Sequence, residues 1–288
     1  MDINEIVVIS GKGGTGKTTL VASLVPFLEN PVIADCDVDA PDLNILFGET
    51  IRESKDFVGL KRAVINEDLC TKCGLCRQKC KFNAISEDIK VSFSKCEGCS
   101  VCEYICPTGA IKMKDCVVGQ VFNSETEYGP MVHARLIPGE ETSGKLVSEV
   151  RKTAKALAEK TGRETIIIDG SPGIACNVIA SITGVKKTVI VIEPTFSGLH
   201  DLEKVHRLVQ NFSVDIMIVI NKCDLSEDGL NAIENYCKEQ DLEIALKIPF
   251  NKDIVKSVSE RKIPSLENKE FFDGIGFAKF VEWIKKTD

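Results

Sequence analysis

The chain has 288 residues, of which 43% are hydrophobic and 27% charged, with 36 Lys and Arg against 43 Asp and Glu. A disordered chain would be less apolar, and no apolar run reaches the roughly 18 residues that a membrane-spanning helix needs. The net charge of -7 argues against a protein whose main task is binding nucleic acid. The acidic start, MDINEIVVIS, lacks the features of a signal peptide. We therefore expect a cytoplasmic protein.

Short β-branched runs alternate with amphipathic helical patterns along most of the chain. Buried parallel strands joined by crossover helices have this pattern. We therefore predict an α/β fold, with a mainly parallel sheet and helices on both faces. The expected strands are 6–9, 32–34, 165–168, 188–192 and 216–220, and the expected helices are 18–28, 144–160, 199–211 and 229–240.

A cysteine-rich stretch interrupts this pattern. Eight of the 13 cysteines lie between Cys70 and Cys106, and the group of four that begins at Cys70 recurs 26 residues later. Stable disulfides are rare in the cytoplasm, so the expected use of these thiols is metal binding. We predict a first α/β part at 1–59, a small α+β insert at 60–115 and a second α/β part at 116–288. The stretch 117–143 is expected to be an extended return from the insert.

A phosphate-binding motif follows the first expected strand. In SGKGGTGKTT, Gly11, Gly16, Lys17 and Thr18 match the pattern G-x-x-x-x-G-K-[ST]. Glycines let backbone amides turn toward phosphates, and the next helix presents its N-terminus to the same anion. Lys17 is expected to reach the β- and γ-phosphates and Thr18 to bind Mg²⁺. The expected phosphate-binding set is Gly11, Lys12, Gly13, Gly14, Thr15, Gly16, Lys17, Thr18 and Thr19.

Lys12, directly after the first glycine, goes beyond the general motif. The segment GKGGTGKTT resembles the deviant P-loop of the MinD, Mrp and nitrogenase iron protein class of ATPases. The resemblance implies a P-loop NTPase fold and hydrolysis of MgATP. It also implies a homodimer that forms when nucleotide binds, in which Lys12 reaches the phosphates of the partner.

Acidic residues match the two switch segments of that family. Asp35 and Asp37 follow an expected strand, where they come near the P-loop at the carboxyl end of the sheet. The resemblance gives Asp37 the positioning of the attacking water and Asp35 an outer contact to Mg²⁺. Asp39 is an additional acid to which the resemblance assigns no role, and capping of a helix near Pro41 is the alternative for these acids.

The second switch segment is TIIIDGSPGIACN. Asp169 ends an expected strand and matches the acid that holds Mg²⁺ through water, while Gly173 matches the glycine whose amide senses the γ-phosphate. The catalytic residues that the resemblance implies are Lys12, Lys17, Asp37 and Asp169.

Two later segments resemble loops that contact the base. VINKCD is similar to the N-K-x-D loop, whose Asp pairs with guanine in GTP-binding proteins. The deviant P-loop family mainly uses ATP and has an Asn at this place. The resemblance therefore implies ATP with Asn221 at the base, leaves the part of Asp224 open, and places Pro249 of IPFNKDI beside the base.

The eight clustered cysteines follow the spacing Cys-x2-Cys-x2-Cys-x3-Cys twice. In such runs three cysteines bind one cluster and the fourth binds the other. The stretch resembles a bacterial-type ferredoxin with two [4Fe-4S] clusters, although Lys81 stands where the first run often has Pro. The alternative, two zinc sites, usually needs a longer loop between cysteine pairs. The implied ligands are Cys70, Cys73, Cys76 and Cys106 for cluster one, and Cys96, Cys99, Cys102 and Cys80 for cluster two.

Three functions are compatible with these resemblances. In the first, ATP binding and hydrolysis control electron transfer from the clusters to a partner metalloprotein. In the second, the protein assembles or inserts a metal cluster into an acceptor, and in the third it is a positioning ATPase with structural clusters. Full ligation by eight cysteines favours electron transfer. No nucleic-acid partner and no membrane anchoring are expected.

Cys176, seven residues after Asp169, is open to two interpretations. The nitrogenase iron protein has a cluster-ligating cysteine at the matching offset, which suggests a metal site shared across the dimer, with Cys116 as a conceivable second ligand. The simpler interpretation is a small buried residue, the usual environment of a free cysteine.

Overall fold

The structure is a computed structural model that describes residues 3–140 and 143–286. The chain folds into two compact units. The first contains the chain up to Ser54, the segment Val121–Arg135, and the chain from Ser143 onward. The second contains Lys55–Gln120 and the segment that begins at Leu136. The second unit thus includes residues on both sides of the predicted insert at 60–115.

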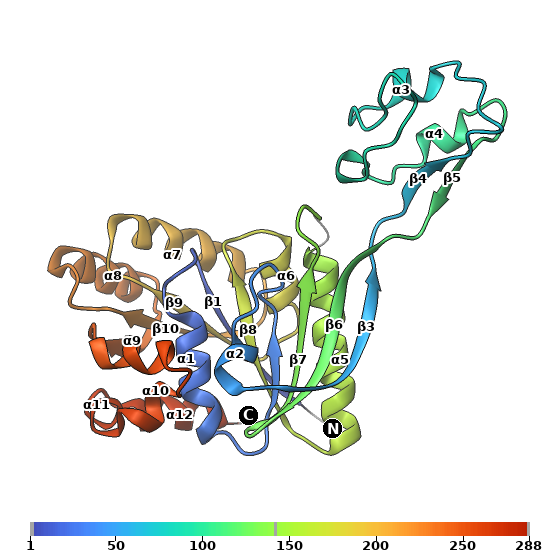
Figure 1. Ribbon diagram of the computed structural model, residues 1–288. Coiled ribbons are helices and arrows are strands. Elements are labelled where there is room, and N and C mark those ends of the chain that lie inside the picture. Colours follow the sequence, from blue (N-terminus) through green and yellow to red (C-terminus); the bar gives the residue numbers. More distant parts are fainter. Residues whose placement is uncertain (1–2, 141–142, 287–288) are drawn as a thin grey trace. The chain divides into compact units, whose positions relative to one another are not determined.

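The first unit contains most of a mainly parallel sheet, as predicted (Figure 1). Within the described residues the sheet has nine strands in the order β11-β10-β9-β1-β8-β2-β7-β6-β3, and the pairs from β11 to β7 are parallel. The strands are β1 (Asn4–Ser10), β2 (Val32–Asp35), β3 (Thr50–Val58), β6 (Val117–Thr126), β7 (Gly129–Leu136), β8 (Thr165–Pro172), β9 (Lys187–Ile192), β10 (Asp215–Asn221) and β11 (Glu243–Ile248).

The register of the central strands brings their carboxyl ends together. Ser10 at the end of β1 pairs with Pro172 of β8 and Val191 of β9, and Asp35 at the end of β2 pairs with Asp169 of β8. The P-loop, which follows β1, therefore lies at the same edge of the sheet as the two acidic segments. Ligands of open α/β sheets bind at this edge.

Helices cover both faces of the sheet, as predicted. One apolar core joins the sheet to α1, α2 and the C-terminal helices, whereas α5 and α6 pack on β2 and β8, and α7 and α8 on β9 and β11. No helix in the described part of the chain is long and apolar enough to cross a membrane. The helices are α1 (Lys17–Leu24), α2 (Leu43–Phe47), α5 (Ser143–Thr161), α6 (Cys176–Ile182), α7 (Phe196–Val209), α8 (Glu227–Glu239), α9 (Lys252–Ser259), α10 (Pro264–Glu267), α11 (Lys269–Gly274) and α12 (Phe277–Lys285), with a 3-10 turn at Val25–Phe27.

The stretch 117–143 differs from the expected extended return. It forms β6 and β7, which are neighbours in the sheet and are linked by Glu127 and Tyr128 alone. A two-residue link between neighbouring strands makes the pair antiparallel. Met131 and Val132 of β7 are fully buried, so β7 continues the core of the sheet.

The second unit carries the clustered cysteines on little regular structure. Its short strands β4 (Arg62–Ile65) and β5 (Ile111–Lys114) pair antiparallel, and its short helices are α3 (Leu75–Lys79) and α4 (Val101–Tyr104), with a 3-10 turn at Phe93–Lys95. Ala63, Ile85 and Ile111 form a small core together with several of the cysteines. A core of this size buries little apolar area, so bonds between the cysteines and a bound group would add to its stability.

The last helix, α12, packs on the sheet through an aromatic cluster. Phe277 stacks edge-on against Phe27 and Phe272, and Phe280 is 2% exposed beside Trp283. The apolar side of α12 is therefore part of the core.

We expect Phe280→Ala to lower the free energy of unfolding by about 3–5 kcal/mol, because truncation of a buried aromatic ring leaves a cavity. Lys279→Ala, on the exposed side of the same helix, should change it by less than about 0.5 kcal/mol. Urea unfolding followed by the fluorescence of Trp283, the one tryptophan of the chain, measures both. Equal effects would show that α12 does not pack as described.

Candidate functional site

The loop between β1 and α1 has the backbone that the phosphate-binding motif requires. Gly14 and Gly16 have φ angles of 80° and 91°, in the left-handed region that favours glycine. At Gly16 a Cβ atom would lie 2.2 Å from Nδ2 of Asn221, which donates a hydrogen bond to the Thr15 carbonyl at 2.7 Å. Only glycine therefore fits at this position, and the predicted base-contacting Asn221 already holds the loop.

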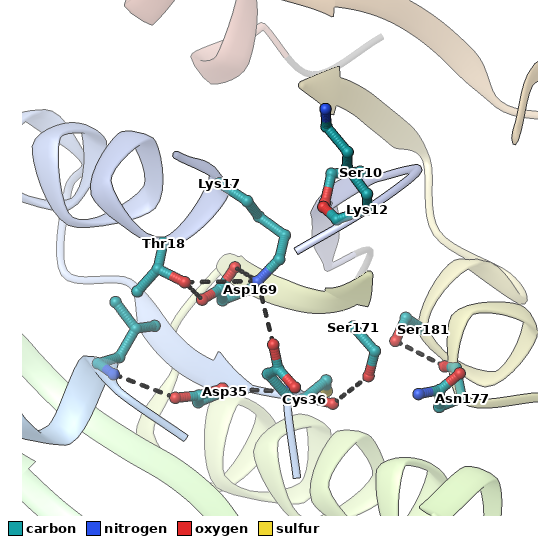
Figure 2. Close-up of polar contacts among 12 residues, drawn as sticks. Ser10, Lys12, Lys17, Thr18, Asp35, Cys36, Asp169, Ser171, Asn177 and Ser181 are labelled. Atoms are coloured by element: carbon teal, nitrogen blue, oxygen red, sulfur yellow. Dashed lines mark hydrogen bonds and ion pairs between the residues drawn. The ribbon is translucent and has the colours of Figure 1, made fainter. Parts of the chain in front are cut away.

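Lys17 and Thr18, the first residues of α1, meet Asp169 of β8 below the loop (Figure 2). Lys17 Nζ lies 2.7 Å from Asp169 Oδ1, and Thr18 Oγ1 donates to Asp169 Oδ2 at 2.6 Å. Asp37 completes the group, with Oδ2 at 3.7 Å from Lys17 Nζ. Burial alone would lower the pKa of Lys17, but Asp169, and then Asp37, raise it above its ordinary value. The structure thus brings four of the predicted site residues together.

Asp35 lies beneath this group and is fully buried. Its Oδ1 accepts from the backbone amide of Asp37 at 3.0 Å and its Oδ2 from that of Leu43 at 3.2 Å. Burial, together with the nearby Asp169, raises the pKa of Asp35 well above its ordinary value. Burial also raises the pKa of Asp37, to about 6, against the lowering effect of Lys17. Asp35 therefore fixes the backbone that carries Asp37.

The donor set at the start of α1 fits a Mg²⁺ ion. Magnesium prefers oxygen ligands, and the Thr18 hydroxyl and the Asp169 carboxylate meet at one point. Asp35 is the predicted outer contact to the ion. Both of its carboxylate oxygens accept hydrogen bonds from backbone amides, and it lies on β2, the strand next to the β8 strand of Asp169. Thr18 and Asp169 are therefore the residues that could hold the ion.

Other predicted residues of the switch segments have different surroundings. Gly173, predicted to sense the γ-phosphate, donates its amide hydrogen to the carbonyl of Ser10 at 2.8 Å. Asp39 is exposed, and Cys176 is exposed at the first position of α6, close to Gly144. The simpler interpretation of Cys176, a buried packing residue, is therefore wrong.

A cavity of about 220 Å³ opens beside the P-loop. Gly16, Asn221 and Pro249 line it, together with apolar side chains that include Phe250 and Ile254. A mainly apolar pocket with a few polar groups suits a planar base. Asp224 does not line the cavity, because its Oδ1 accepts from the backbone amide of Phe250 at 2.7 Å. Asp224 thus shapes the loop that forms one wall of the cavity.

On the other side of the P-loop, Lys12 takes part in a network that the sequence analysis missed. Lys12 Nζ lies 3.5 Å from Oε2 of Glu193 and donates to Ser197 Oγ at 3.4 Å. Glu193 also pairs with Lys222, through its Oε1, at 2.6 Å. Glu193 directly follows β9, so the rule that located Asp37 and Asp169 at strand ends could have found it.

In the second unit, the eight clustered cysteines line two separate small cavities. Each cavity takes three cysteines from one half of the repeat and one from the other, which is the division that the spacing implied. Among the described residues, no group of three or more His, Cys, Asp or Glu could hold a single metal ion. The ligands of a [4Fe-4S] cluster bind separate corners of a cube. Two such groups of four thiols are the kind of donor set that two [4Fe-4S] clusters would need. The sets are Cys70, Cys73, Cys76 and Cys106, and Cys80, Cys96, Cys99 and Cys102.

Comparison with known proteins gives matches to both parts of the chain. Residues 6–264 match the CobQ/CobB/MinD/ParA nucleotide binding domain family. The uncharacterized protein MJ0578 of Methanocaldococcus jannaschii is 33% identical over 287 residues, 98% of each chain. The cell division ATPase MinD of Pyrococcus furiosus has a similar fold, with a TM-score of 0.60 at 18% identity over 99% of each chain. The polyferredoxin MvhB of Methanothermobacter thermautotrophicus is 37% identical over 65 residues, 22% of this chain and 16% of its own.

We expect Lys17→Ala to abolish MgATP turnover, because it removes the cation that is expected to face the phosphates and leaves Asp169 buried without its charge partner. Asp37→Ala should lower turnover by about 100-fold or more while the protein still binds MgATP. Asp39→Ala is the matched control and should leave turnover unchanged. Phosphate release and nucleotide binding are measured separately. Full turnover in Asp37→Ala together with loss in Asp39→Ala would reassign the water-positioning part to Asp39.

Proposed function

Because this chain belongs to the CobQ/CobB/MinD/ParA nucleotide binding domain family, we propose that it is a nucleotide-dependent dimeric ATPase that carries two [4Fe-4S] clusters. ATP binding and hydrolysis would control electron transfer from the clusters to a partner metalloprotein. The observation that carries the proposal is the presence on one chain of the P-loop group and of two cavities lined by four cysteines each.

The nucleotide site supports the ATPase part. Lys17 would contact the β- and γ-phosphates, Thr18 and Asp169 would hold Mg²⁺, and Asp37, on a half-buried segment beside them, would orient the attacking water. Asn221 and Pro249 would contact the base in the adjoining cavity. Lys12 is directed away from the Lys17 group (Figure 2), which suits a lysine that acts on the phosphates of a second copy.

The second unit supports the redox part. Its cysteines line cavities in which each half of the repeat contributes to both, and a 65-residue stretch is similar to a protein named as a polyferredoxin. Such clusters, when bound, supply one-electron chemistry. Ligation of each cluster by four cysteines leaves no coordination position free. This arrangement favours electron transfer over cluster delivery, because a carrier that releases its cluster needs exchangeable ligands.

We expect about eight iron and eight acid-labile sulfide per chain after anaerobic preparation. Cys102→Ser should lower the iron content and change the visible spectrum, because it removes a ligand from cluster two. Cys116→Ser is the matched control, since Cys116 lines neither cavity, and should keep the full iron content. Stoichiometric zinc without visible absorbance would contradict the cluster assignment.

The two main functions separate in an acceptor assay. The dithionite-reduced protein, freed of excess dithionite, is mixed with MgATP and either an apo-ferredoxin, which can take up a cluster, or an oxidised viologen dye, which can take up electrons, under anaerobic conditions. If the protein transfers electrons, it keeps its iron during the assay. If it delivers clusters, iron moves to the acceptor in proportion to the ATP used. Transfer of iron at the rate of ATP hydrolysis would therefore replace electron transfer with cluster delivery as the proposed function.

A further inference from the structure

Glu193 occupies a central place among the loops of the nucleotide site. It directly follows β9, which lies between β1 and β10 in the sheet. The P-loop follows β1, and the loop with Asn221 and Lys222 follows β10. Glu193 thus emerges between the segment expected to bind phosphates and the segment expected to bind the base.

The contacts of Glu193 link these two loops. One carboxylate oxygen lies 3.5 Å from Lys12 Nζ and the other 2.6 Å from Lys222 Nζ. The side chain of Glu193 is 11% exposed, whereas those of Lys12 and Lys222 are 35% and 32% exposed. A carboxylate that is buried to this degree needs a cation, but either lysine could leave for solvent or for another anion. The carboxylate is therefore the fixed member of the network and the lysines are the movable ones.

The two contacts are unequal. The Lys222 pair is short enough for a charge-assisted hydrogen bond, and the Lys12 pair at 3.5 Å is not. Lys12 has a second weak contact, to Ser197 Oγ at 3.4 Å. Lys12 can therefore be withdrawn while Lys222 continues to neutralise Glu193.

We propose that Glu193 is a positioning residue that holds Lys12 on its own subunit before dimerisation, and that Lys222 sets how tightly it does so. The inference rests on the proposed function, in which Lys12 binds the phosphates of a second copy. When that second copy with its nucleotide approaches, its phosphates compete with Glu193 for the Lys12 ammonium. Lys222 remains on Glu193 and so lowers the cost of releasing Lys12. Because Lys222 also lines the base cavity, the same carboxylate connects base binding to the release of Lys12.

The proposal predicts opposite effects for the two partners of the network. Glu193→Gln keeps the shape of the side chain but removes the charge that holds Lys12. We expect it to lower, by about three- to tenfold, the concentration of non-hydrolysable MgATP analogue at which half of the protein is dimeric. Lys222→Met removes the competing cation, strengthens the hold of Glu193 on Lys12, and should raise that concentration by a similar factor.

The double variant tests whether Lys222 acts through Glu193. If it does, Lys222→Met has no further effect on dimerisation once Glu193→Gln is present. Sedimentation velocity across a series of analogue concentrations measures the dimer fraction. Nucleotide affinity of the monomer is measured separately in a Lys12→Ala background, so that an effect of Lys222→Met on the base cavity is not counted as dimerisation.

The matched control is Glu234→Gln, which removes the same charge from an ion pair with Lys247 at 2.5 Å. It should leave the dimerisation midpoint unchanged. An unaltered midpoint in Glu193→Gln, or a shift of Lys222→Met in the same direction as Glu193→Gln, would overturn the inference. If the wild-type protein does not dimerise with the analogue at all, the proposed dimer itself fails. Failure of the proposed dimer is thus distinguishable from failure of the Glu193 inference, because it is seen in the wild-type protein before any variant is compared.

Discussion

The contact between Lys17 and Asp169 is the interaction on which the nucleotide site depends. Both side chains are nearly inaccessible, at 6% and 1% exposure, and breaking one partner of a buried pair costs about 3–5 kcal/mol. The pair joins the start of α1 to the end of β8, and Thr18 and Asp37 gather around it. A lysine surrounded by carboxylates is also ready to exchange partners. In the proposed function, phosphates and Mg²⁺ would take over Lys17 and Asp169 as partners.

The sequence predicted the central part of this arrangement well. The five expected strands are present with slightly longer limits, because β-branched runs in buried parallel strands give a clear signal. Lys17, Thr18, Asp37 and Asp169 meet because parallel strands end at one edge. The hairpin of β6 and β7 was not predicted, since the stretch 117–143 was expected to run extended back to the α/β part. The contacts of Asp224 and Glu193 were not predicted either. That residues at the carboxyl ends of parallel strands lie near a site can be inferred from the sequence, but the partner of each side chain cannot.

The second unit depends on a different constraint. Its core is small and consists in part of the cysteines themselves. Because the fourth cysteine of each run lines the cavity of the other run, neither half of the repeat can form its cavity alone. The backbone of the unit is also closely packed. At Gly98 a Cβ atom would lie 2.5 Å from the carbonyl oxygen of Lys61, so a larger residue would not fit there. If the unit binds the proposed clusters, their binding would therefore contribute to its folding.

The central claim is that nucleotide state and redox state are coupled within one chain. Redox titration followed by EPR, without nucleotide, with MgADP and with a non-hydrolysable MgATP analogue, tests it most directly. A coupling of about 1.4 kcal/mol would appear as a shift of about 59 mV in a one-electron midpoint potential. The account predicts such a shift between the ADP and ATP-analogue states of the wild-type protein and none in Lys17→Ala. Potentials and EPR spectra that are identical in all three nucleotide states would contradict it.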